Sequence, residues 1–211
     1  MMSLSDYRNE YTRFTLDESG LDPNPRVQFH HWLKEAMDDN AVEPTAMTLS
    51  TVNAAGQPTS RIVLLKGYED DGLRFFTNFD SRKGQELAQN NRACLMFFWP
   101  TLHRQVRFEG SVQKLSADIA DEYFHSRPVE SRISAIASPQ SHPVRNRAEL
   151  EQRVQELEKE FGDQPPRPEN WGGYVLVPDY IEFWQGRACR LHDRFAFNLT
   201  DSAWTVSRLA P

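Results

Sequence analysis

Short strand-like runs separated by tight turns are the feature that most constrains the fold of this 211-residue chain. Residues 46–79 hold three such runs, with "NAAGQP" and "EDDG" as the turns between them, which predicts an antiparallel meander. The later runs are "ACLMFFW", "RQVRFEGSVQKL", "YVLVP", "YIEFWQG", "CRLHDRFAF" and "AWTVSRL". Short strands joined mostly by tight turns favour a mainly β, antiparallel fold that closes into a barrel.

Helical patterns interrupt the strands and predict a β-barrel decorated by α insertions. The first helix is expected in residues 24–40, because Asn24 can cap it and Pro25 suits its first position. Its buried face is predicted from apolar residues at helical spacing, namely Phe29, Trp32, Leu33, Ala36 and Met37. Other helices are expected after Ser81, from Ser116 to Pro128, through "SRISAIA", and over residues 146–161, where Asn146 and Glu149 stand in capping-box positions.

Residues 1–20 lack a strong periodicity and are expected to form a mobile arm or lid, with residues 21–211 as a single domain. The net charge of -6 argues against a nucleic-acid partner, which requires an excess of Lys and Arg. The polar N-terminal segment is unlike a signal peptide, and no apolar run is long enough to span a membrane. Two cysteines and six scattered histidines show no metal-ligand spacing. We therefore expect a cytoplasmic protein with no metal site.

Positive charge inside strand-like segments is the most informative chemistry of the chain. The run "SRIVLLKG" sets Arg61 and Lys66 at the two ends of a β-branched and leucine segment. Arg82 and Lys83 stand at a helix start, where backbone N–H groups and the helix dipole favour an anion. Further basic segments contribute Arg104, Gln105 and Arg107, then Arg127, and finally the run "RLHDR".

The run "CRLHDRF" is expected to continue as a strand, so its side chains would alternate between two faces. Arg190, His192 and Arg194 would share one face toward a ligand, while Leu191, Asp193 and Phe195 would lie on the other. Asp193 is then expected to orient its neighbours or to support the structure.

Each of these features also has an ordinary structural explanation. A solvated helix start explains the adjacent Arg and Lys about as well as a phosphate site does. Ion pairs at a barrel rim would explain Arg61 and Lys66, and His192 alone is more typical of a structural histidine. Trp184 alone is more typical of core or interface packing. Only the combination of several cationic segments in an acidic protein favours a ligand with more than one anionic group, for which the planar fork of Arg is suited.

The chain resembles the pyridoxine/pyridoxamine 5′-phosphate oxidases over nearly its whole length. The resemblance rests on motifs that occur in order: "EPTAM", "RIVLLKG", "FFTNFDSRKGQEL", "RQVR" with "EG" after it, "YFHSRP", "WGGY", "IEFWQG", "RLHDRF" and "RLAP". It implies an FMN-binding split β-barrel that is active as a homodimer, with the flavin in a cleft between the subunits.

The resemblance also implies roles for individual residues. The expected flavin contacts are Arg61, Ile62, Val63, Leu64, Leu65, Lys66, Phe76, Thr77, Arg82, Lys83, Gln105, Gln140, Ser141, Trp184 and Arg194, with Arg82 and Lys83 at the FMN phosphate. The expected pocket for the substrate phosphate is formed by Lys66, Tyr123, Arg127 and Ser131. Arg190 and His192 are the expected catalytic pair over the substrate ring, with Leu191 between them, and Arg8 and Tyr11 would form a lid.

The implied reaction is the oxidation of pyridoxamine 5′-phosphate or pyridoxine 5′-phosphate to pyridoxal 5′-phosphate. A hydride would pass from the substrate to the flavin, and O2 would be reduced to H2O2. Two other functions remain open: an oxidase of the same scaffold that acts on another ring system, as in phenazine biosynthesis, and a non-catalytic flavin- or vitamin-B6-binding protein. The first would not need a pocket for a substrate phosphate, and the second could dispense with Arg190 and His192.

Overall fold

The structure, a computed structural model, describes residues 10–69 and 72–211. Four of the five α-helices in these residues start at a capping side chain. The α-helices are α1 (Pro25–Asp38), α2 (Arg82–Gln89), α3 (Ala117–Ser126), α4 (Val129–Ala137) and α5 (Arg147–Phe161). Their caps are Asn24 for α1, Ser81 for α2, Ser116 for α3 and Asn146 for α5, each of which accepts a hydrogen bond from an N–H group of the first turn. The predicted helices are therefore confirmed.

The predicted buried face of α1 is confirmed except at Met37. Phe29, Trp32, Leu33 and Ala36 are buried, whereas Met37 is 47% exposed. At about 100° of rotation per residue, Met37 lies roughly 80° round the helix from Phe29. The barrel covers a narrower stripe of α1 than the apolar pattern suggests.

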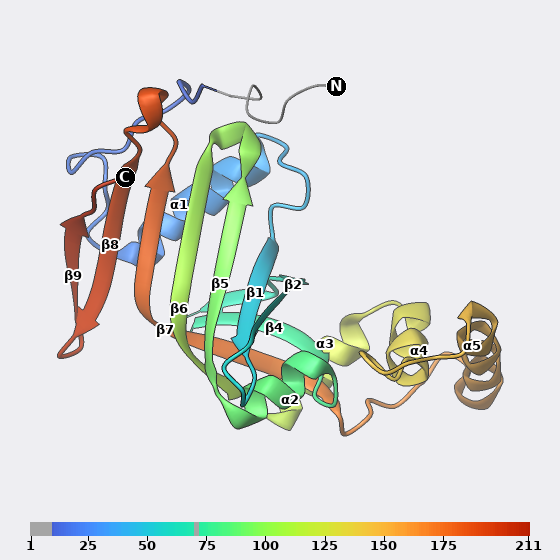
Figure 1. Ribbon diagram of the computed structural model, residues 1–211. Helices are drawn as coiled ribbons and strands as arrows, with labels where there is room; N and C mark the ends of the chain where they lie inside the picture. Colours follow the sequence, from blue (N-terminus) through green and yellow to red (C-terminus); the bar gives the residue numbers. More distant parts are fainter. Residues whose placement is uncertain (1–9, 70–71) are drawn as a thin grey trace, which may run out of the picture.

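The described residues form nine strands in one antiparallel sheet. The strands are β1 (Ala46–Val52), β2 (Pro58–Leu64), β3 (Gly67–Glu69), β4 (Gly72–Asn78), β5 (Arg92–Trp99), β6 (Arg104–Lys114), β7 (Trp171–Gln185), β8 (Asp193–Thr200) and β9 (Ala203–Arg208). Their order is β2-β1-β5-β6-β7-β4-β3, and β8 also pairs with β7 and then with β9. Figure 1 shows the sheet curling round, with α1 behind it and α4 and α5 projecting to one side. The predicted barrel with helical insertions is confirmed.

Strand β7 is long because its first half pairs with β4 and its second half pairs with β8. The sequence suggested two strands, but residues 171–185 form one strand that pairs with β6 on one edge. On its other edge, residues 171–176 pair with β4 and residues 180–185 pair with β8. The register shifts between Glu109 and Gly110, opposite Pro178. A Cβ atom on Gly110 would lie 2.0 Å from the carbonyl oxygen of Val177, so this bulge requires glycine.

The predicted meander of the first three strand-like runs is confirmed at both of its turns. Within the described residues, β2 pairs with β1 across the first turn, and β3 pairs with β4 across the second. The second run is not one continuous strand, however, because it is divided into β2 and β3 between Leu64 and Gly67. Strand β2 lies at an edge of the sheet, and its exposed fraction alternates along its length. Local turn signals specified both reversals of the chain but not the break between β2 and β3 or the pairing of β4 with β7.

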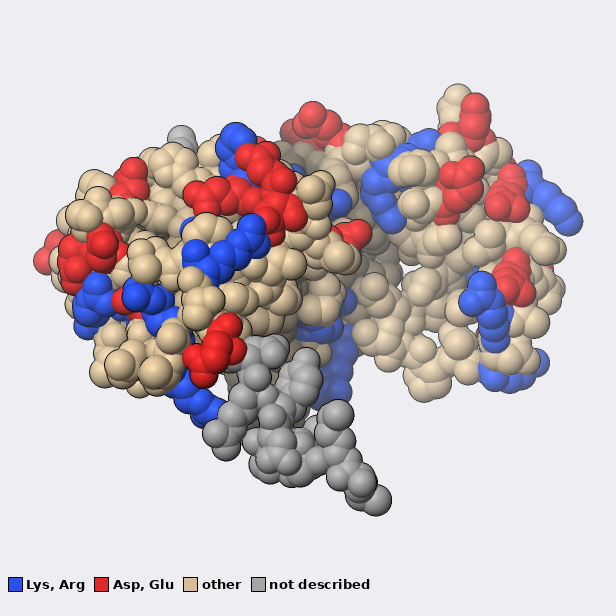
Figure 2. Space-filling model, turned by 90° about the horizontal axis from the view of Figure 1, so that it is seen from above, with Lys and Arg blue, Asp and Glu red and all other residues tan. Residues whose placement is uncertain are grey.

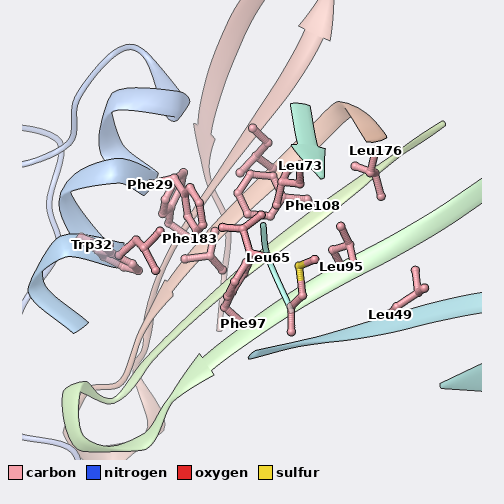
Figure 3. Close-up of a cluster of buried hydrophobic side chains, with 14 of the residues drawn as sticks. Phe29, Trp32, Leu49, Leu65, Leu73, Leu95, Phe97, Phe108, Leu176 and Phe183 are labelled. Atoms are coloured by element: carbon pink, nitrogen blue, oxygen red, sulfur yellow. The ribbon is translucent and has the colours of Figure 1, made fainter. Parts of the chain in front are cut away.

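The core lies between α1 and the concave side of the sheet, and aromatic side chains dominate it (Figure 3). Phe29 of α1 is fully buried. Its ring centroid lies 4.8 Å from that of Phe108, 5.0 Å from that of Phe97 and 4.8 Å from that of Tyr68. These edge-on and tilted contacts attach α1 to strands β3, β5 and β6.

Replacement of Phe29 by Ala should lower the free energy of unfolding by roughly 3–5 kcal/mol, because it leaves a cavity among aromatic rings. Val27 on the same helix is 37% exposed and provides the control. We expect Val27→Ala to lower the free energy by less than about 1 kcal/mol. Denaturant titration followed by circular dichroism measures both, and equal losses would contradict the assigned core.

Candidate active site

A cavity of about 550 Å³ lies between the edge strand β2, strand β4, the start of α2 and helices α3 and α4. It gathers most of the predicted flavin and substrate-phosphate residues. The lining includes Ile62, Val63, Leu64, Lys66, Phe76, Thr77, Lys83, Tyr123, Arg127, Ser131 and Gln140. Segments that are up to 109 residues apart in the sequence, from Ile62 to Trp171, thus meet in one pocket.

Lys83 contributes a buried positive charge to this cavity. Its side chain is held at the first turn of α2, and Nζ donates to Oγ1 of Thr77 at 3.0 Å and to Oε1 of Gln140 at 2.9 Å. Burial and the nearby charge of Arg61 lower the pKa of Lys83 to about 8, although Glu86 acts in the opposite direction. An anion in the cavity would favour the charged form of Lys83, at a helix N-terminus that also attracts anions.

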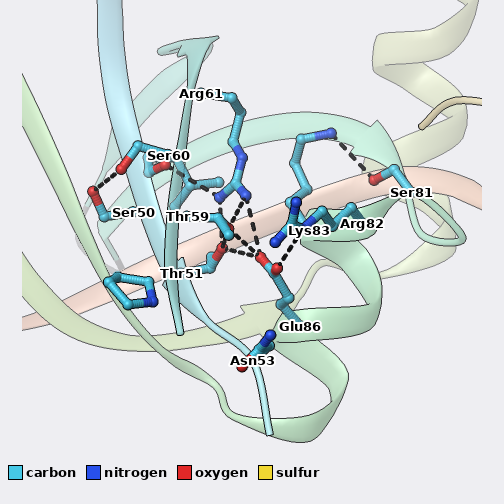
Figure 4. A network of polar contacts seen from close by, with 12 residues as sticks. Ser50, Thr51, Asn53, Thr59, Ser60, Arg61, Ser81, Arg82, Lys83 and Glu86 are labelled. Atoms are coloured by element: carbon cyan, nitrogen blue, oxygen red, sulfur yellow. Dashed lines mark hydrogen bonds and ion pairs between the residues drawn. The ribbon is translucent and has the colours of Figure 1, made fainter. Parts of the chain in front are cut away.

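Two arginines among the predicted flavin contacts, Arg61 and Arg82, are both held by a carboxylate that the sequence analysis missed. Glu86 is 4% exposed, and its Oε2 accepts from Arg61 at 3.1 Å while its Oε1 accepts from Arg82 Nε at 2.9 Å (Figure 4). Oε2 also accepts from the hydroxyls of Thr51 and Thr59. Burial alone would raise the pKa of Glu86, but the bonds from two threonines and two arginines lower it to about 2.

The Glu86 network gives three cations among the predicted flavin contacts different surroundings. Arg61 is enclosed by polar partners, whereas the side chain of Arg82 is 60% exposed with its Nε bound. Lys83 faces the cavity. The spacing of Arg82 and Glu86, four residues on a helix, was the available signal for this network. The contacts of Glu86 with Arg61, Thr51 and Thr59 depend on the fold.

Arg127 provides the second cationic group of the cavity. Its Nη2 donates to the carbonyl oxygen of Ser131 at 2.9 Å, and its guanidinium lies 4.9 Å from the ring centroid of Trp171. The Nη1 group is buried and has no hydrogen-bond partner. Tyr123 stacks on Phe76 at 3.9 Å, which forms an aromatic wall beside it. A buried, unpaired guanidinium N–H group is unfavourable until an acceptor occupies the cavity.

The remaining predicted flavin residues form a row at the other end of the barrel. Gln105 pairs with Trp184, and Trp184 pairs with Arg194, across β6, β7 and β8. This row lies near the β5–β6 connection, whereas the cavity lies near α3 (Figure 1). Within the described part of the chain, no residue of the row lines the cavity. Arg194 donates to Glu182 at 2.8 Å and to the carbonyl oxygen of Ala210 at 2.8 Å.

The predicted strand through Arg190 and His192 is wrong. Residues 188–190 form a 3₁₀ turn, and β8 begins only at Asp193. Cys189 and Arg190 have φ angles of 55° and 60°, in the left-handed region that only glycine adopts freely. The alternation of side chains therefore starts at Asp193 and does not set the direction of Arg190. A turn at this point was not visible because the segment lacks Gly, Pro and Asn.

His192 lies against the row just described. Its ring centroid is 4.6 Å from that of Trp184 and 5.9 Å from that of Tyr11. The backbone N–H of Arg187 donates to its Nδ1 at 3.1 Å. Burial, followed by the charge of Arg190, lowers the pKa of His192. The imidazole is therefore neutral at pH 7, with its proton on Nε2.

Several predicted residues lie away from both groups. The side chain of Leu65 is 7% exposed and belongs to the core, so only its backbone is available to a ligand. Ser141 has a φ angle of 69° and lies beside the cavity residue Gln140 without lining the cavity. Leu191 is 70% exposed. Arg8 lies outside the described residues.

The surface carries charges of both signs side by side on the face seen in Figure 2. Residues 10–69 and 72–211 include no group of three or more His, Cys, Asp or Glu that could hold a metal ion. In the same residues, no helix combines the length and the apolar character needed to cross a membrane.

Comparison with known proteins agrees with these features. Residues 33–160 match the family model described as pyridoxamine 5′-phosphate oxidase. Residues 171–211 match the model described as the pyridoxine 5′-phosphate oxidase C-terminal dimerisation region. Proteins named pyridoxine/pyridoxamine 5′-phosphate oxidase are 52% identical in Janthinobacterium sp. (strain Marseille) and 53% identical in Paraburkholderia phymatum. Both matches cover the whole of each chain.

Solved structures place the fold in the same group. PhzG from Burkholderia lata, in complex with tetrahydrophenazine-1-carboxylic acid, superposes with a TM-score of 0.90 at 28% identity, over 95% of this chain and 100% of that chain. A pyridoxamine 5′-phosphate oxidase-related, FMN binding protein from Nostoc punctiforme shares the fold with a TM-score of 0.71 at 19% identity, over 90% of this chain and 100% of that chain. Together with the full-length relatives, these matches show that the chain belongs to the pyridoxamine 5′-phosphate oxidase family of oxidoreductases.

Proposed function

We propose that this protein oxidises pyridoxamine 5′-phosphate and pyridoxine 5′-phosphate to pyridoxal 5′-phosphate, with FMN as cofactor and O2 as the electron acceptor that becomes H2O2. The proposal rests on one observation: a single cavity has two separate cationic anchors, Lys83 from α2 and Arg127 from the end of α3. Two anchors suit two phosphate groups, one on the cofactor and one on the substrate. The full-length relatives named for this activity support the same assignment.

The residues around Lys83 fit the phosphate end of FMN. A buried ammonium group with a lowered pKa gains a counter-charge when a phosphate binds. Thr77 and Gln140 offer further polar atoms, and the neighbouring Val63 and Phe76 offer apolar surface for a ring system. When bound, a flavin supplies the two-electron acceptor that protein side chains lack.

The residues around Arg127 fit the phosphate of the substrate. Its unpaired Nη1 group would donate to a phosphate oxygen, and Lys66 and Ser131 also line the cavity. Tyr123 adds an aromatic face beside them. Phosphate anchoring away from the reacting carbon uses binding energy to orient the substrate ring.

A second copy of the chain would complete the site. Gln105, Trp184 and Arg194 stand at the opposite end of the barrel from the cavity, so one chain cannot bring both groups to the same flavin. The match of residues 171–211 to a dimerisation region supports a homodimer in which each subunit supplies this row to the cavity of the other.

Arg190 and His192 are the proposed catalytic residues, because they lie on the turn next to that row. A neutral His192 would present its Nε2–H group as a hydrogen-bond donor to the substrate ring. The oxidation removes two electrons and two protons from the substrate, and O2 takes up both as H2O2. The amine substrate also consumes one water molecule and releases ammonia.

The similarity to PhzG supports one alternative function, in which the protein is an oxidase that acts on a tricyclic substrate. An unphosphorylated substrate would not require the buried, unpaired Nη1 group of Arg127 in the cavity that Lys66 and Ser131 also line. A protein that only binds flavin would not require the strained turn that carries Arg190. A peroxide assay with phosphorylated and unphosphorylated substrates distinguishes both alternative functions from the proposed one.

The protein purified without added cofactor should be yellow, run as a dimer and release FMN rather than FAD on denaturation. It should produce H2O2 with pyridoxamine 5′-phosphate, and far more slowly with pyridoxamine, which lacks the phosphate that Arg127 is proposed to bind. The measurements are an absorbance spectrum, gel filtration and a peroxide assay. A colourless monomer that produces no H2O2 would contradict the proposed function.

Arg127→Ala should weaken the binding of pyridoxal 5′-phosphate by about tenfold to a hundredfold, which corresponds to one charge-assisted hydrogen bond. FMN affinity should change little, because Lys83 and its partners remain. Arg132→Ala is the matched control on the adjacent helix, since Arg132 donates to Asp163 and does not line the cavity. Paired titrations measure both affinities, and equal weakening of the two ligands would mean that Arg127 is misassigned.

The affinity for FMN should fall as the pH rises from 8 to 9. Lys83 has a pKa of about 8, and a bound phosphate favours its protonated form, so binding takes up a proton above that pH. The dissociation constant should rise by at most about tenfold per pH unit for one proton. Riboflavin, which lacks the phosphate, and the variant Lys83→Met should show no such dependence. Flavin fluorescence measures the affinities, and a flat profile for FMN would remove Lys83 from the phosphate site.

A further inference from the structure

Asp193, the first residue of β8, joins three separate segments through one carboxylate. It is 8% exposed. Its Oδ2 accepts from the backbone N–H of Leu16 at 3.1 Å and from Nη1 of Arg187 at 2.7 Å. Its Oδ1 accepts from Nη1 of Arg208 at 2.9 Å. The N-terminal segment, the turn before β8 and strand β9 therefore meet at this side chain.

The turn before β8 has a conformation that needs outside support. Cys189 and Arg190 both have positive φ angles, and neither is glycine. Such residues are strained and persist only where the surroundings impose them. Within the turn, the backbone N–H of Leu191 donates to the carbonyl oxygen of Ala188 at 3.2 Å. The ion pair of Arg187 with Asp193 joins the two ends of the turn, and the N–H of the same Arg187 orients His192.

The N-terminal segment is fixed next to this turn by the same carboxylate. Leu16 is 5% exposed and belongs to the hydrophobic core, so the bond from its N–H to Asp193 is shielded from water. Five residues earlier, the ring of Tyr11 lies 4.6 Å from His103 and 5.8 Å from Trp184. A Cβ atom on Gly186 would come within 2.8 Å of the Tyr11 ring, so the two segments are in close contact.

We propose that Asp193 is a positioning residue for the oxidation. It couples the N-terminal segment to the 187–193 turn, so that Tyr11, Arg190 and His192 are held around one space. The inference rests on the proposed function, in which that turn contacts the substrate. Asp193 itself does not reach the substrate, because all three of its partners are groups of the protein. The negative charge of Asp193 is balanced by its ion pairs with Arg187 and Arg208.

The test compares Asp193→Ala with Glu18→Gln in the FMN-loaded protein. Glu18 is the matched control. It belongs to the N-terminal segment, and its Oε1 lies 2.8 Å from Nε of Arg208. Its replacement by Gln removes a charge from this segment but no direct partner of Asp193. Asp193→Ala should raise the KM for pyridoxamine 5′-phosphate at least tenfold, with a smaller change in kcat, since it loosens groups that bind the substrate. FMN affinity should change less than the KM, because none of the three partners of Asp193 is a proposed flavin contact. Glu18→Gln should leave KM unchanged within about twofold.

Amide hydrogen exchange gives a second readout that does not need turnover. Peptides that cover residues 11–16 should exchange at least tenfold faster in Asp193→Ala than in the parent and Glu18→Gln proteins. If Asp193→Ala does not fold, Asp193→Asn, which keeps one acceptor oxygen, should show smaller changes in the same direction. Unchanged exchange, or an unchanged KM in an active parent enzyme, would overturn the inference. A parent protein without oxidase activity but with the expected exchange difference would refute the proposed function and leave the coupling intact.

Discussion

The bent strand β7 is the constraint on which the rest of the structure depends. It pairs with β6 on one edge and with β4 and then β8 on the other, and the bulge at Gly110 and Pro178 allows the change of partner. The first half of β7 thereby supports the wall that carries Phe76 and Thr77, and the second half carries Trp184. One strand thus sets the cavity and the row of Gln105, Trp184 and Arg194 at fixed places on the same barrel. A substitution at the bulge would disturb both.

The charges of the cavity follow from how each cation is paired. Arg61 and Arg82 have a carboxylate partner in Glu86, so they are stable without a ligand. Lys83 has only neutral oxygen atoms as hydrogen-bond partners, and Arg127 keeps an unpaired N–H group. Buried charges that lack an opposite charge are unfavourable, so these two residues identify the places where an anion stabilises the protein most. The arginines around Glu86 are better understood as a rigid frame for that site.

Local features of the fold could be predicted from the sequence, and long-range pairings could not. The caps Asn24, Ser81, Ser116 and Asn146 act within one helical turn, so their pattern is visible in a few residues. The two hairpins of the meander were visible from their turns, whereas the pairing of β4 with β7 is set by closure of the barrel around the core. The motifs named residues that the structure brings together in one cavity. Alternation failed at Arg190, because a run of polar and apolar residues is the same in a strand and in a strained turn. Glu86 and Asp193 both lie inside motifs, but most of their contacts join distant segments and depend on the tertiary structure.

The division of the predicted site between two ends of one barrel has a physical consequence. A flavin in the cavity would have Lys83, Thr77 and the aromatic wall on one side, and nothing from the Trp184 row of its own chain. The row meanwhile has polar and aromatic side chains that are only partly buried, next to Phe98, which is 48% exposed. The open side of the cavity and the half-exposed row become complementary when two chains pair around a two-fold axis. Each chain then supplies its row to the cavity of the other. Binding of the cofactor would in that case also join the subunits, and the affinity for FMN and the stability of the dimer would be linked.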